Sequence, residues 1–210
     1  MVSQTMKLMQ STFIKLRTTT AVFHQSFVGF HPRTLSTKQI PKVKHHDYVL
    51  GEDEIRDANE QYKNKIEIQE RDRFGRGLFA QTSFQEGDLV MSSRAVKITE
   101  TKDSHTLQNN WKSHIVMDLP AIMINHKCEA NVGLKDNVRT GSYDFFALTD
   151  IEKDEELYLD YETAEYEIDG FQCSCGSDLC RHTLKGFKYH GGVVKQQYGE
   201  EFISSYLLHK

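Results

Sequence analysis

Residues 173–181 read CSCGSDLCR, and this short stretch holds three of the four cysteines in a chain of 210 residues. The fourth, Cys128, lies far upstream in the stretch NHKCEAN. Three thiols this close cannot all pair with one another, and Gly176 allows a tight turn among them. The pattern predicts a structural zinc site, while disulfides and unlinked buried thiols remain open as alternatives; the predicted ligands are Cys128, Cys173, Cys175 and Cys180. Such a closed site has no position for water, so the metal would fasten a C-terminal flap to a core loop.

The composition predicts one folded domain with additional segments. Twelve Phe, nine Tyr and one Trp can fill a core, which excludes disorder throughout the chain. Mean hydropathy is −0.57. Since no apolar stretch approaches the roughly 20 residues that a bilayer span needs, we expect no membrane partner.

The net charge of −4 is distributed unevenly along the chain. Residues 1–46 contain no Asp or Glu and seven of the 26 Lys and Arg, so the remaining residues hold 19 basic side chains against 30 acidic ones. An acidic body repels a phosphate backbone, and we therefore expect no direct binding of nucleic acid. It attracts basic partners instead.

Residues 1–46 form a basic leader that is rich in Ser and Thr. Its apolar residues Met6, Met9, Phe13 and Leu16 recur at the spacing of one helical face. This pattern is typical of a mitochondrial or plastid transit peptide, and RTLS at residues 33–36 resembles a cleavage site. The alternative is a disordered basic tail that binds an acidic partner or serves as a nuclear signal, with the protein in the nucleus or cytoplasm.

The body of the chain predicts a mostly β fold of the α+β class, built from several small sheets. Residues 47–65 are charged and, up to about residue 62, favour helix; they predict a solvated approach segment more than a core element. Asn109 and Asn110 favour a hairpin turn, and residues 194–208 have the spacing of a closing helix. Short β-rich runs separated by turn residues occur at residues 66–68, 77–80, 88–91, 95–99, 114–117, 143–148 and 156–161.

Four motifs occur in a fixed order: RFGRGLFA at residues 73–80, INHKCEANVGL at 124–134, DEELYLDY at 154–161 and CSCGSDLCR at 173–181. Together they resemble the SET-domain protein lysine methyltransferases of the compact type that carry a post-SET zinc motif. The resemblance covers about residues 66–190. It implies a SET domain at 66–170 with a knot-like core, a post-SET zinc flap at 171–190 and a C-terminal helix at 191–210.

The resemblance also implies the site residues. S-adenosylmethionine would enter on one face and the target lysine on the other, with Tyr161 as the catalytic residue between them. Leu159 and Tyr161 would line the substrate channel. The implied cofactor-binding residues are Gly75, Arg76, Gly77, Asn125 and His126.

Several positions depart from the family pattern. Ala130 replaces a usual Pro, and Asp154 and His182 stand where Gly is common. Leu159 replaces a usual Tyr or Phe, which gives the hypothesis that the enzyme proceeds beyond monomethylation. The glutamates of DEEL and of YETAEYE at residues 161–167 are most simply interpreted as a solvated acidic rim.

The resulting hypothesis is an S-adenosylmethionine-dependent methyltransferase acting on a lysine in a basic protein segment, such as a histone tail. One alternative is a non-catalytic SET module that binds partners. Another is a lysine methyltransferase of an organelle with a non-histone substrate, which only the leader supports.

Overall fold

A computed structural model describes residues 50–71 and 75–209. The leader, with its transit-peptide pattern, and residues 72–74 lie outside the described residues, so the prediction of organellar targeting stays a prediction. Among the described helices, none is long and apolar enough to cross a membrane.

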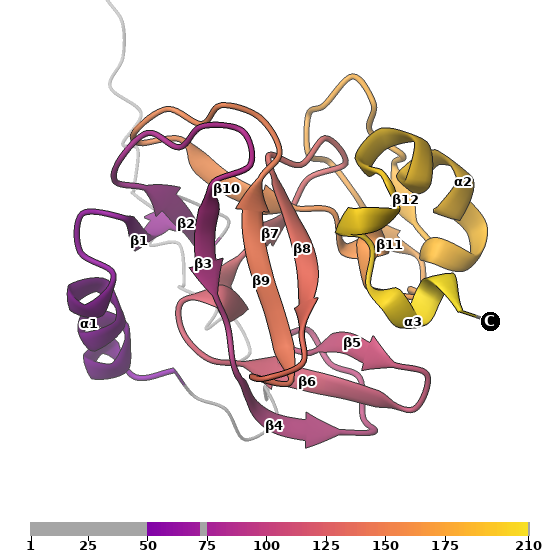
Figure 1. Ribbon diagram of the computed structural model, residues 1–210, viewed down its shortest axis with the longest axis horizontal. Helices are drawn as coiled ribbons and strands as arrows, with labels where there is room; N and C mark the ends of the chain where they lie inside the picture. The colour runs from indigo at the N-terminus through magenta and orange to yellow at the C-terminus, as the bar shows by residue number, and fades with distance from the viewer. Residues whose placement is uncertain (1–49, 72–74, 210) are drawn as a thin grey trace, which may run out of the picture. The chain divides into compact units, whose positions relative to one another are not determined.

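The described residues are mostly β and form several sheets, as the sequence predicts; the structure has three (Figure 1). Each of the seven predicted runs overlaps a strand, and the first arm of the predicted hairpin overlaps an eighth. Four strands were not predicted: Asn125–His126, Val132–Asn137, Phe171–Gln172 and Thr183–Leu184. The strands are β1 (Ile66–Arg71), β2 (Gly75–Ala80), β3 (Leu89–Ser92), β4 (Ala95–Thr99), β5 (Leu107–Asn110), β6 (Ser113–Met117), β7 (Asn125–His126), β8 (Val132–Asn137), β9 (Ser142–Ala147), β10 (Glu156–Leu159), β11 (Phe171–Gln172) and β12 (Thr183–Leu184).

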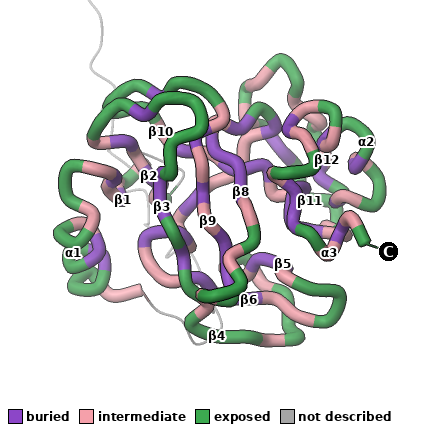
Figure 2. The backbone as a smooth tube through the Cα atoms, viewed as in Figure 1, coloured by how far each residue is buried: buried purple, intermediate pink, exposed green. Residues whose placement is uncertain are grey.

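The main sheet has the strand order β1-β2-β10-β8-β9-β3, with β7 paired to β10. Strand β10 pairs antiparallel with β2 on one side and parallel with β7 and β8 on the other. Successive residues of a strand face opposite sides, so Leu157 and Leu159 share one face of β10. Both side chains are fully buried. Buried residues are concentrated along β8 and β9, as Figure 2 shows.

The second sheet has the order β4-β6-β5 and includes the predicted hairpin. The turn lies two residues later than expected, since Asn109 and Asn110 are the last residues of β5 and Asn110 pairs with Ser113. Trp111 and Lys112 therefore form the turn. The third sheet consists only of β11 and β12, which belong to the cysteine-rich flap.

The charged segment before β1 is more than a solvated approach. It contains helix α1 (Glu52–Gln61), whose residues Ile55 and Ala58 are buried in the main core beside Ile66 and Ile68. The expectation was wrong because two apolar residues at a spacing of three suffice to bury one helical face when all other positions are charged or polar.

The C-terminal segment is not one closing helix. Helix α2 (Phe187–Tyr198) begins earlier than predicted and ends at Gly199, whose φ of 76° interrupts the helix. A single 3-10 turn, η3 (Glu200–Phe202), and the short helix α3 (Ser205–Leu208) follow. Val194, Tyr198, Ile203 and Leu207 form a second apolar cluster that also contains Ala130.

Candidate functional site

The site lies where β10 runs parallel to β7. Tyr158 pairs with Asn125 and Leu159 pairs with His126, so two motifs about 30 residues apart in the sequence lie side by side. Tyr161 follows β10 closely and begins the 3-10 turn η2 (Tyr161–Thr163). The threaded, knot-like crossing of these segments stays a prediction.

Tyr161 is fixed at both ends. Its hydroxyl donates a hydrogen bond to the Ile124 carbonyl oxygen at 2.9 Å, and its backbone N–H donates to Nδ1 of His126 at 3.2 Å. Burial raises the pKa of Tyr161 to about 12. The hydroxyl is therefore protonated at neutral pH, and its oxygen keeps lone pairs for a further hydrogen bond.

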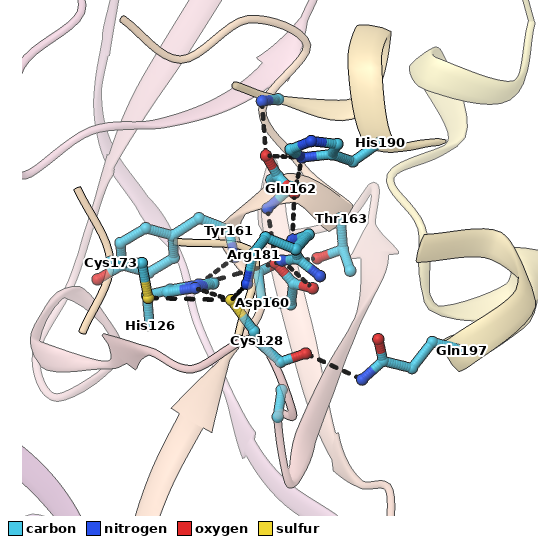
Figure 3. Close-up of polar contacts among 12 residues, drawn as sticks. His126, Cys128, Asp160, Tyr161, Glu162, Thr163, Cys173, Arg181, His190 and Gln197 are labelled. Atoms are coloured by element: carbon cyan, nitrogen blue, oxygen red, sulfur yellow. Dashed lines mark hydrogen bonds and ion pairs between the residues drawn. The ribbon is translucent and has the colours of Figure 1, made fainter. Parts of the chain in front are cut away.

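His126 lies between Tyr161 and the cysteines (Figure 3). Burial lowers its pKa to about 4, so the ring is neutral at pH 7. Since Nδ1 accepts the Tyr161 N–H, the ring proton belongs on Nε2, which lies 3.3 Å from the Cys128 sulfur. The ring thus connects the tyrosine backbone to the cysteine cluster.

Two cavities meet at Tyr161. The larger, of about 340 Å³, is lined mainly by apolar residues that include Ile124, Leu159 and Leu184. The smaller, of about 280 Å³, is lined by His126 and by residues of the flap, among others. Both cavities are also lined by Asn125, Tyr161 and Phe171.

The predicted cofactor-loop residues Gly75, Arg76 and Gly77 open strand β2. Gly75, Arg76 and Gly77 are not among the described residues that line the smaller cavity. The Arg76 side chain pairs with Glu52 of α1 at 2.5 Å instead, and its carbonyl oxygen accepts a hydrogen bond from the Asn125 amide at 2.8 Å. Asn125 is in turn 3.1 Å from Glu156 Oε1. Whether these residues bind a cofactor stays a prediction.

Gly77 has a clear packing role. A Cβ atom at this position would overlap Glu156 Oε1 and would lie 2.8 Å from Arg71 Cδ and 3.0 Å from Asn125 Nδ2. Only a residue without a side chain leaves room for these three groups. Gly77 therefore allows Asn125 to approach strand β2.

The four cysteines of the chain come together, with all Sγ atoms within 4.8 Å of one another. All four are free, which leaves no disulfide, and the Cys128 and Cys173 sulfurs are 3.9 Å apart. Sulfurs bound to a tetrahedral zinc ion at about 2.3 Å are roughly 3.8 Å from one another. This donor set fits zinc, and the four cysteines would hold it as a structural ion.

Helix α2 supports the loop that carries Cys128. The Tyr198 hydroxyl and the Gln197 amide each donate a hydrogen bond to the Cys128 carbonyl oxygen, both at 2.9 Å. The Tyr198 hydroxyl also accepts a hydrogen bond from the Ala130 N–H at 3.1 Å. Ala130 therefore has a function that Pro could not perform, because Pro has no N–H. Asp154 and His182, the two positions where Gly is usual, have φ of 69° and 59°, the left-handed region that favours Gly.

Leu159 is fully buried and lines the larger cavity. Two aromatic side chains, Phe171 and Tyr166, are the candidates for filling the space that a tyrosine at position 159 would occupy. Phe171 lines the larger cavity, whereas Tyr166 packs edge-on against Trp111. The number of methyl groups transferred stays a prediction.

The interpretation of the glutamates as a solvated rim was wrong for three of them. Glu162 and Glu165 are buried, and the Glu156 side chain is only 10% exposed in an ion pair with Arg71 at 2.8 Å. Glu165 pairs with Lys102 at 2.8 Å, and this carboxylate lines the larger cavity. These pairs join distant segments, so local sequence carries no signal for them.

Sequence reasoning also missed Arg71 and Tyr158, which line the smaller cavity. Glu156 and Tyr158 are two residues apart on β10 and so share one face, where the Tyr158 hydroxyl donates to Glu156 at 2.5 Å. This alternation was the available signal. Arg71 had none, since its position depends on the β1–β2 pairing.

Comparison with known proteins gives a family match and distant structural likenesses. The family model of the SET domain matches residues 75–162. Comparison with curated protein sequences gave no match. Two crystal structures of KRYPTONITE, one in complex with mCHG DNA and SAH and one with mCHH DNA, an H3(1-15) peptide and SAH, are each 21% identical with a TM-score of 0.47.

Those likenesses cover 58% and 57% of this chain and 29% of the KRYPTONITE chains. A structure of Arabidopsis thaliana SUVH6 with SAM is 19% identical over 58% of this chain and 33% of that one, also with a TM-score of 0.47. This chain thus spans about a third or less of each of these three chains. The motifs, the mostly β architecture and the family match lead to one conclusion: the chain carries a SET domain, which spans residues 75–162.

Proposed function

We propose that this protein transfers a methyl group from S-adenosylmethionine to a lysine side chain of a protein substrate. The observation that carries the proposal is the pair of cavities that share Tyr161 and Asn125 as walls. A methyl donor in one cavity and an amine in the other would meet at the tyrosine. In-line attack by the amine needs this two-sided geometry.

The smaller cavity suits the donor. Its lining contains a cationic side chain, Arg71, beside the neutral polar groups of Asn125, His126 and Tyr158. These groups can pair with a carboxylate and read an adenine edge. The donor, when bound, would supply an activated sulfonium methyl group; the S–C bond breaks as the N–C bond forms.

The larger cavity suits a lysine side chain. Its apolar walls, including Leu107, Met117 and Ile122, disfavour the charged ammonium and so lower the pKa of an entering lysine. Tyr161 can accept a hydrogen bond from the amine and orient its lone pair toward the methyl group. The lysine must be deprotonated before it attacks, because an ammonium group has no lone pair with which to form the N–C bond. A free lysine with a pKa near 10.4 is about 0.1% neutral or less at pH 7, so a lowered pKa raises the reactive fraction.

The substrate proposed is a basic segment, such as a histone tail. The support is electrostatic: residues after the leader carry a strong excess of acidic side chains, and Asp103 is among the polar residues lining the larger cavity. Peptide methylation measured at rising ionic strength checks this, because screening weakens such attraction.

Tyr161→Phe tests the proposed reaction. We expect the variant to keep its fold and cofactor affinity while turnover falls by roughly 10²-fold or more, since one positioned polar group is lost from the transition state. The assay is methyl transfer to a lysine peptide, with cofactor binding measured by calorimetry.

Tyr189→Phe is the matched control, because Tyr189 lies exposed on α2. Near-normal turnover of Tyr161→Phe would limit Tyr161 to a packing role. A wild-type protein that binds neither S-adenosylmethionine nor its demethylated product would instead be a non-catalytic binding module.

A further inference from the structure

Two buried carboxylates flank the tyrosine of the site. Asp160 and Glu162 directly precede and follow Tyr161, and both are fully buried. Buried carboxylates are costly unless cations and hydrogen bonds compensate them. Their partners come from the cysteine-rich flap and from helix α2 (Figure 3).

Arg181 compensates both carboxylates with one side chain. Its terminal nitrogen Nη2 lies 2.6 Å from each oxygen of Asp160, and its Nε lies 2.7 Å from Glu162 Oε2. The Arg181 side chain is only 9% exposed. A planar fork of donors can span two acids in this way, whereas the single ammonium of a lysine cannot reproduce the arrangement.

The backbone of Arg181 belongs to the cysteine cluster. Arg181 follows Cys180, and its N–H points to the Cys128 sulfur at 3.4 Å. One residue therefore connects the sulfur cluster to both neighbours of Tyr161. The flap also supplies Cys173 and Cys175 to the wall of the smaller cavity.

Glu162 extends this connection to the start of helix α2. Its Oε1 accepts the N–H groups of Lys185 and Gly186, each at 2.7 Å, and the His190 Nδ1 donates to the same carboxylate at 2.9 Å. Glu162 thus holds the end of the flap and the first turns of α2 against the site.

We propose that Arg181 is a positioning residue, which holds Tyr161 in register with the flap by clamping Asp160 and Glu162. The effect on turnover that this inference predicts rests on the proposed methyltransferase function. A displacement of about 1 Å at a reacting group can cost on the order of 10² in rate, so a loosened clamp lowers turnover before it lowers binding. Arg181 itself is absent from the described residues that line the two cavities, so it acts through its neighbours.

Arg181→Lys tests the clamp, with Arg56→Lys as the matched control because the Arg56 side chain is 69% exposed. We expect Arg181→Lys to lower kcat by roughly 10-fold to 10²-fold while KM for S-adenosylmethionine changes by less than about threefold. Zinc content stays at the wild-type value, and amide hydrogen exchange of residues 171–186 becomes faster. The control changes none of these quantities. A purely structural role would lower the melting temperature without this split between kcat and KM.

Two further measurements cover the outcomes that a single variant leaves open. If Arg181→Lys does not fold, Glu162→Gln decides, because it removes the charge facing Arg181 and keeps an acceptor for Lys185 and Gly186; a folded Glu162→Gln with wild-type kcat overturns the proposal. If the wild-type protein transfers no methyl group, the proposed function fails, and hydrogen exchange alone decides the clamp. Unchanged protection of residues 171–186 in Arg181→Lys, or a kcat within twofold of wild type, overturns it.

Discussion

Gly77→Ala tests whether this glycine is needed for packing between strands. The new methyl group would overlap Glu156 Oε1 and would lie 2.8 Å from Arg71 Cδ and 3.0 Å from Asn125 Nδ2, which is closer than Cβ atoms ordinarily approach other groups. The three side chains also hold one another, since Glu156 pairs with Arg71 at 2.8 Å and accepts from Asn125 at 3.1 Å. They must therefore move together.

The expected cost follows from these contacts. Overpacking of a well-packed site costs about 1–3 kcal/mol. For a protein of this size, the melting temperature falls by roughly 2–4 °C for each kcal/mol. Because Asn125 and Arg71 line the smaller cavity, we also expect S-adenosylmethionine to bind more weakly, by roughly 10-fold if one hydrogen bond of about 1.4 kcal/mol is lost.

Thermal unfolding and calorimetry measure the two effects, and Gly192→Ala is the matched control. Gly192 lies in α2, and a methyl group added there would have nothing within 4 Å, so alanine should stabilise the helix by up to about 1 kcal/mol. If Gly77→Ala were as stable as the wild type and bound the cofactor equally well, the packing argument would be refuted. Weaker cofactor binding with no loss of stability would instead favour a Gly77 backbone that approaches the ligand directly.

Two predictions concern the flap. Cys175→Ser should lower bound zinc well below one ion per chain and speed hydrogen exchange of residues 171–186, while the β core stays folded because the ion would fasten only the flap. Elemental analysis and exchange mass spectrometry measure these effects, and full zinc occupancy would contradict the ligand assignment. His182→Gly should raise the free energy of unfolding by roughly 0.5–1 kcal/mol, because the φ of 59° at His182 costs a residue with a Cβ about 1 kcal/mol. Urea unfolding measures this, and a lower midpoint for the variant would show that the His182 side chain stabilises the flap.

The sequence predicted strands with alternating apolar residues, such as β1, and strands rich in aromatic residues, such as β9, but not β8. Strand β8 reads VGLKDN, in which Gly133 and the residues Lys135 to Asn137 are of types that are depleted in strands. It is nevertheless the strand between β10 and β9, where pairing along its whole length with β9 stabilises it. Tertiary pairing here outweighs local propensity. Helix α1 was underestimated for the same reason, since only docking buries Ile55 and Ala58.

The sequence alone determined which chemical groups this protein has: the ordered motifs of a SET domain, and four cysteines that together could hold one metal ion. Only the tertiary structure decided how those groups are connected. It showed that Glu156 and Glu162 are buried partners of Arg71 and Arg181, that Arg76 points to α1, and that Tyr161 separates two cavities. The physical reason is that the strength of an ion pair depends on the distance between the charges and on their desolvation. Neither quantity is encoded in a local sequence pattern when the partners lie 19 to 85 positions apart and are brought together only by the docking of β10, β1 and the flap.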